Sequence, residues 1–123
     1  MKKVLFGLGT LLMLFVMAAC SSGVGKIESL TKDVEKKSED WDKAKWTEVV
    51  TEVYETATEL LDKDGIKEKD FDKITEAVED FESEARSSDT KEKYYDVIRK
   101  DKISKLKKKY TDKMNKVKKK LDD

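Results

Sequence analysis

Between residues 24 and 121, apolar side chains recur at steps of three and four, which is the spacing of one face of an α-helix. Residues 46–61 are rich in β-branched residues, which could suggest a strand. Glutamates recur at helical steps on the opposite face of this segment, however, which favours a helix. The sequence therefore predicts an all-α fold. The apolar stripes are Val24, Ile27, Leu30 and Val34; Trp46, Val49, Val50, Val53, Tyr54, Ala57, Leu60 and Leu61; Phe71, Ile74, Val78, Phe81 and Ala85; and Tyr94, Tyr95, Val97 and Ile98, leading into Ile103, Leu106, Tyr110, Met114, Val117 and Leu121.

The boundary between the first two stripes is weakly marked. Residues 38–41 favour a break, with Ser38 or Asp40 as the N-cap of the next helix. Nothing in these residues forbids a helix that continues through them. Residues 26–63 therefore form either one helix or two.

The later boundaries are clearer. Gly65 follows the second stripe at a position where a helix takes a left-handed cap. Residues 87–90 interrupt the pattern, and Asp89 with Glu92 has the spacing of a capping box. From Lys91 to Leu121 the pattern predicts one helix, about 46 Å long at 1.5 Å per residue.

Stripes this narrow must pack against one another, because short amphipathic helices are not stable alone in water. Short links at 64–65 and 87–90 make consecutive helices antiparallel. We therefore expect a small, elongated antiparallel bundle of three to four helices, which occupies residues 26–123.

The first 19 residues have the pattern of a secretory signal peptide. Lys2 and Lys3 precede an apolar run over residues 4–16, and small residues follow that run. A membrane-spanning helix needs about 20 apolar residues, so the run is too short to span a bilayer comfortably. We expect residues 1–19 to be removed.

The segment 17–20, Met-Ala-Ala-Cys, resembles the lipobox of bacterial lipoproteins, in which Leu is usual at the position of Met17. The resemblance implies that the thiol of Cys20 receives a diacylglycerol and that the chain is cut before it. Two or three acyl chains give stable anchoring, whereas one chain binds a membrane only marginally. Cys20 is the only cysteine and stands where the lipobox needs it. The alternative is an ordinary signal peptide that happens to contain a cysteine.

Residues 20–25 are mostly small, which predicts a short, flexible, lipidated tether before the helical domain. Ser21 is not Asp, the usual signal for inner-membrane retention in enteric-type cells, and no acidic cluster follows Cys20. By resemblance to lipoprotein sorting signals, we expect an anchor in the outer membrane that faces the periplasm. In a Gram-positive cell the anchor would lie in the cell membrane.

After Ala19 the chain has an acidic part and a basic part. Residues 20–90 carry 11 basic and 21 acidic residues, a net charge of −10, whereas residues 91–123 carry 14 and 6, a net charge of +8. One interpretation is that the basic helix lies beside acidic helices and its lysines are solvated. The other is that a lysine stripe binds an anionic envelope component, either lipopolysaccharide or anionic lipid. The candidate residues are Lys105, Lys108, Lys109, Lys113, Lys116, Lys119 and Lys120.

Several chemistries lack the residues that they need. The chain has no histidine and one cysteine, which excludes Cys–His and Ser–His nucleophile pairs and zinc sites built from those residues. No glycine-rich phosphate loop is present, and the carboxylates fall at helical-surface positions. We expect no catalytic residue, cofactor, metal, nucleic-acid partner or small-molecule substrate. Trp41 and Tyr94, near predicted helix ends, are the aromatic residues to consider for binding.

The whole chain resembles small Lys/Glu-rich helical lipoproteins of unknown function, common in Bacteroidota. The lipobox, the segment 40–46 with its two tryptophans, and the basic last helix carry this resemblance. It implies location and fold but no activity. We expect a non-catalytic structural or protein-interaction role in the cell envelope, with the membrane at Cys20 and an unknown envelope protein as partners. The alternative role is the binding of an anionic envelope component through the last helix.

Overall fold

The computed structural model describes the backbone of residues 19–63 and 65–122, and the side chains of these ranges from residue 23 onward. All the described elements are helical, which confirms the all-α prediction. None of the described helices combines the length and the apolar character that crossing a bilayer requires. In chain order the elements are α2 (Ala19–Lys37), the 3₁₀ turn η3 (Ser38–Asp40), α3 (Lys43–Leu61), α4 (Glu68–Arg86), α5 (Lys91–Ile98) and α6 (Asp101–Asp122).

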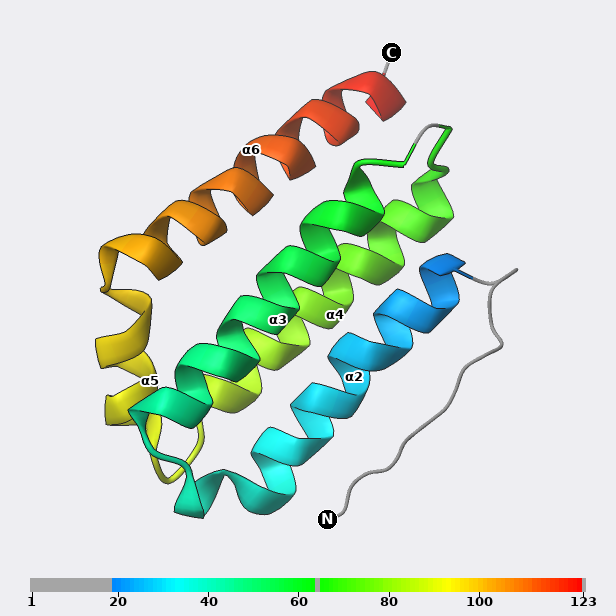
Figure 1. Ribbon diagram of the computed structural model, residues 1–123. Coiled ribbons are helices and arrows are strands. Elements are labelled where there is room, and N and C mark those ends of the chain that lie inside the picture. The colour runs from blue at the N-terminus through cyan, green and yellow to red at the C-terminus, as the bar shows by residue number, and fades with distance from the viewer. Residues whose placement is uncertain (1–18, 64, 123) are drawn as a thin grey trace.

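The four long helices form an elongated bundle with α3 and α4 at its centre (Figure 1). Helix α2 packs on α4 and α3, and α6 packs mainly on α3, so α2 and α6 lie on opposite sides of the central pair. The short α5 lies at one end of the bundle and connects α4 to α6. The consecutive helices α2, α3 and α4 alternate in direction, as the short connections between them predict.

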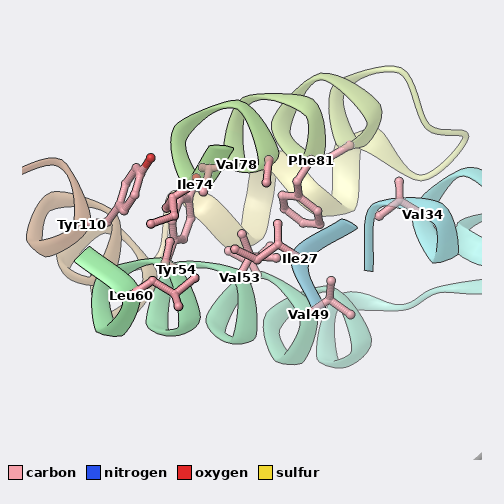
Figure 2. Packing of buried hydrophobic residues seen from close by; sticks show 14 of the residues in the cluster. Ile27, Val34, Val49, Val53, Tyr54, Leu60, Ile74, Val78, Phe81 and Tyr110 are labelled. Carbon is pink, nitrogen blue, oxygen red and sulfur yellow. The ribbon is translucent and has the colours of Figure 1, made fainter. Parts of the chain in front are cut away.

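The core is built from the predicted stripes. Buried side chains from α2, α3, α4 and α6 point toward one another in the middle of the bundle (Figure 2). Their helical spacing places them on one face of each helix, and their removal from water is the main force that holds the helices together. Among the residues with no more than 2% of their surface exposed are Ile27, Val34, Trp46, Val50, Val53, Tyr54, Leu61, Ile74, Val78, Phe81, Tyr94 and Ile103.

The predicted break between the first two stripes is confirmed, so α2 and α3 are separate helices. The N-cap of α3, however, is Asp42, whose side chain accepts a 2.8 Å hydrogen bond from the backbone N–H of Lys45. The proposal of Ser38 or Asp40 as the cap is wrong, because both lie in η3. Ser38 is buried, and its carbonyl oxygen accepts a hydrogen bond from the Thr90 hydroxyl.

The prediction of one helix from Lys91 to Leu121 is wrong. Helix α5 ends at Ile98, the backbone N–H of Lys100 bonds back to the carbonyl of Val97, and α6 begins at Asp101. The apolar spacing explains the break, since the step from Ile98 to the next apolar residue is five positions. The chain uses this break to turn from the end of the bundle onto the side of α3 (Figure 1).

The segment 20–25, expected as a flexible tether, is helical. Val24 is 9% exposed and joins the core, and a Cβ atom at Gly23 would lie 2.7 Å from both methyl carbons of Leu60. Helix α2 is therefore packed against the end of α3 from Gly23 onward. Val24 belongs to the same apolar face as Ile27, so its burial favours helix over a free tether.

Two local predictions at the other boundaries also differ from the structure. Gly65 has the left-handed conformation expected of it, with φ 69°, but it lies three residues beyond the C-cap of α3 at Asp62 and belongs to the loop. The capping box of Asp89 and Glu92 is wrong, because the N-cap of α5 is Thr90. The Thr90 side chain makes no capping bond and is used for tertiary contacts instead.

Candidate functional site

The candidate site on α6 is positioned by a narrow buried stripe. Ile103, Tyr110 and Val117, spaced seven residues apart, are the buried residues of this helix. Because seven residues make nearly two full turns, all three lie on one face, toward the rest of the bundle. The lysines between them are directed to the flanks and the outer face of α6. Six of the seven predicted lysines are exposed, and Lys113 is partly buried.

Lysines on the flanks of α6 face acidic residues of the neighbouring helices. The Nζ atom of Lys113 lies 2.5 Å from a carboxylate oxygen of Asp62 at the end of α3. The hydrogen bond from Lys113 holds the pKa of the Asp62 carboxyl below its usual value. Lys109 lines a shallow hollow together with Glu55 and Glu59 of α3. These contacts are the arrangement expected of a basic helix that lies beside acidic ones.

The outer lysines have fewer acidic neighbours. Lys108 pairs with Asp112 one turn along the same helix, with 3.1 Å between Nζ and a carboxylate oxygen. Within residues 23–63 and 65–122, the structure shows no ion pair for Lys105, Lys116, Lys119 and Lys120. Of the seven candidates, Lys108 and Lys113 form ion pairs. Lys109 lies beside Glu55 and Glu59 without an ion pair among the described residues, and the remaining four lysines are exposed and likewise form none there.

A partly buried polar contact links α3 to α4 beside α6. Tyr54 is fully buried, and its hydroxyl donates a 2.5 Å hydrogen bond to the carboxylate of Glu82. The same carboxylate forms an ion pair with Lys107 of α6, whose Nζ atom lies 3.8 Å away. Burial, and then the charge of Glu82, raises the pKa of the Tyr54 hydroxyl far above its ordinary value. A phenol in this state keeps its proton and donates it in a hydrogen bond. The group therefore fastens three helices together.

This contact could not be predicted from the sequence, because Glu82 is one of many acidic residues on helix surfaces. No periodicity distinguishes it from its neighbours. Its position directly after the buried Phe81 places it at the edge of the apolar face, and that is the one signal in the sequence.

A second polar contact lies at the α5 end of the bundle. The indole N–H of Trp46 donates a 2.8 Å hydrogen bond to the hydroxyl of Thr90, which in turn donates a 2.7 Å bond to the carbonyl of Ser38. Trp46 also packs edge-on against Trp41, with ring centroids 4.9 Å apart. These contacts join η3, α3 and the start of α5, and Trp41 and Tyr94 are 7% and 1% exposed. Both aromatic residues considered for binding are therefore core residues.

Cys20, the residue predicted to be lipidated, lies in the first turn of α2, and its side chain lies outside the described part of the chain. The signal peptide predicted over 1–19 is outside the described residues, except for the backbone of Ala19. Within the described ranges, no three His, Cys, Asp or Glu side chains gather in a way that would hold a metal ion. Comparison with protein-family models, curated proteins and solved structures finds no match to this chain.

Proposed function

We propose that this chain is a lipid-anchored protein of the cell envelope, with a non-catalytic structural or protein-interaction role. One observation carries the proposal: the lipobox-like segment 17–20 ends at Cys20, and the structured bundle follows it almost at once. The acyl chains would attach at Cys20, on the outer membrane facing the periplasm or, in a Gram-positive cell, on the cell membrane. The bundle would then present its charged helix faces to an envelope partner.

The support for a non-catalytic role comes from how the internal polar groups are used. In the buried Trp46–Thr90–Ser38 contact and in the Tyr54–Glu82 contact, the polar groups are bonded to one another and join separate elements of the bundle. The hollows described around the bundle are open and lie on its outer surface, lined largely by charged side chains. Such a surface suits recognition by another macromolecule better than it suits conversion of a small substrate.

Substitution of Cys20 with serine tests the anchor. We expect the wild-type chain to sediment with membranes and the Cys20→Ser chain to move almost entirely to the soluble fraction, because the acyl chains supply the membrane affinity. Mass spectrometry of the wild-type chain should find Cys20 at the amino terminus, carrying acyl groups. Ser22→Ala is the matched control and should stay with the membrane. An unmodified thiol at Cys20 in the native protein would overturn the proposal.

A second candidate function is the binding of an anionic envelope component, lipopolysaccharide or anionic lipid, through α6. The observation that favours it is the set of exposed cations Lys105, Lys116, Lys119 and Lys120, for which the described residues supply no ion-pair partner. Each lysine near an anionic membrane surface contributes about 1 kcal/mol of attraction, so four of them are sufficient to orient a small domain.

A further inference from the structure

A hollow of about 360 Å³ lies between the end of α3, the loop that follows it and the last turns of α6. Its apolar part is formed by Leu61, Ile66, Val117 and Leu121. Leu61 and Val117 are buried core residues, whereas Ile66 and Leu121 are only partly buried and keep apolar atoms in contact with solvent. The hollow is thus a place where the core of the bundle reaches the surface.

Lysines surround this apolar surface. Lys63 comes from the loop after α3, and Lys113, Lys116 and Lys120 come from successive turns of α6. Asp62 is the one carboxylate among the described lining residues, and it is paired with Lys113. Three cations therefore remain around an apolar surface, an arrangement that complements a molecule with an anionic head and an apolar body.

The hollow lies at the end of the bundle where α2 begins. Gly23 of α2 packs against Leu60, and the next residue of α3, Leu61, lines the hollow. Figure 1 shows the start of α2, the loop between α3 and α4, and the end of α6 at this same end of the bundle. Cys20 precedes Gly23 by three residues, about 4.5 Å along the axis of a helix.

We propose that this hollow binds the head group of an anionic phospholipid in the leaflet to which the chain is anchored. The inference rests on the proposed lipid anchor at Cys20, which would hold this end of the bundle against the bilayer. Since α2 is packed from Gly23 onward, no long tether separates the acyl chains from the bundle. The phosphate would lie among Lys63, Lys116 and Lys120, and the apolar surface would face the upper part of the acyl chains.

The test uses the full lipidated chain purified from membranes and placed on two kinds of vesicle, phosphatidylcholine alone and an equimolar mixture with phosphatidylglycerol. Acetylation of individual lysines is followed by mass spectrometry. We expect acetylation of Lys116 and Lys120 to be about fivefold slower on the anionic vesicles, the factor that corresponds to the attraction of one lysine. Lys91 and Lys100, at the α5 end of the bundle, should react equally on both.

A matched pair of variants sharpens the test. In the Lys116→Gln/Lys120→Gln chain, the protection of Lys63 on anionic vesicles should fall, whereas in the Lys91→Gln/Lys100→Gln chain it should remain. All four substituted side chains are exposed, so both variants keep the core intact. Equal acetylation of Lys116 and Lys120 on the two vesicle types would overturn the proposal. Protection of Lys105 and Lys108 in their place would overturn it too, in favour of contact along the side of α6.

The experiment distinguishes a chain that lacks the lipid anchor at Cys20 from a chain whose hollow does not bind the lipid head group. A chain that stays on both vesicles without selective protection has its anchor and lacks the lipid site. A chain that binds only anionic vesicles, with Lys116 and Lys120 protected, has the lipid site and lacks the anchor. A chain that binds neither overturns both.

Discussion

Replacing Trp46 with alanine is expected to lower the free energy of unfolding by about 3–5 kcal/mol, the usual cost of removing a large buried aromatic side chain. Trp46 has no exposed surface and packs against Trp41 and Tyr94, with ring centroids at 4.9 and 5.2 Å. Its indole N–H also supplies a donor to Thr90. Small domains have a total stability of about 5–15 kcal/mol, so this variant should be close to unfolded at ambient temperature.

Urea unfolding followed by circular dichroism measures this loss. Trp46→Phe is the informative companion, since it keeps an aromatic ring and removes the N–H donor, and it should cost less than the alanine change. Glu48→Ala, an exposed change on the same helix, should stay within about 0.5 kcal/mol of the wild type. If Trp46→Ala lost less than about 1.5 kcal/mol, the tryptophan would not be the centre of this end of the core.

The parts of the fold that follow from local spacing could be predicted from the sequence. Phe71, Ile74, Val78, Phe81 and Ala85 form an uninterrupted helical stripe, and all five are buried in α4. An amphipathic helix has one way to remove such a stripe from water, which is to turn it toward other helices. Fold class, the stripes and the short connections therefore follow from spacing alone.

Contacts between distant parts of the chain could not be predicted in this way. Thr90 appears in the sequence as one polar residue of a helix boundary, and its place beneath Trp46, 44 residues away, is decided by how α3 and α5 pack. The same holds for Tyr54 and Glu82, which are 28 residues apart. Hydrogen bonds of this kind depend on the register between helices, and the spacing within one helix does not determine that register.

For the candidate lysines, too, some properties follow from the spacing within one helix and others depend on contacts between helices. Their exposure follows largely from the period of α6, because the lysines fall off the face that carries Ile103, Tyr110 and Val117. Which lysines are paired depends on α3 and α4, as Lys113 with Asp62 and Lys107 with Glu82 show. The hollow beside Lys116 needs the loop after α3 to meet the last turns of α6, and no motif in the sequence marks that meeting.

Raising the pH above 10 is expected to unfold the bundle through its buried tyrosines. Burial, and then the nearby charge of Glu82, raises the pKa of Tyr94 from 10.0 to about 12. The same two causes raise the pKa of Tyr110 and Tyr54 further. Each phenol ionises in the unfolded chain near its ordinary pKa but stays neutral in the folded one, because the phenolate would lose its hydration inside the core.

The sign of the effect follows from proton binding. Above pH 10 the folded state holds protons that the unfolded state has released, so stability falls as the pH rises. The contribution of Tyr94 is complete below pH 10 and is lost as the pH rises toward about 12. One such group removes about 1.4 kcal/mol per pH unit, and three together remove about 4 kcal/mol per unit. By pH 12.5 the three phenols have removed about 10 kcal/mol, so we expect cooperative loss of helix between about pH 11 and 12.5 for a stability in the lower part of the 5–15 kcal/mol range.

Circular dichroism and the ultraviolet absorbance of tyrosinate, recorded together during an alkaline titration, measure this transition. Tyr110→Phe is the decisive variant, since no side-chain hydrogen bond of the Tyr110 hydroxyl is found within the described residues and the variant retains the ring. We expect this variant to resemble the wild type at pH 8 and to lose stability about one third less steeply above pH 10. The main rise in tyrosinate absorbance should coincide with the loss of helix. A rise that is complete near pH 10 while the helices persist would show that these phenols ionise in the folded state near their ordinary pKa, which contradicts the raised pKa values expected from their burial.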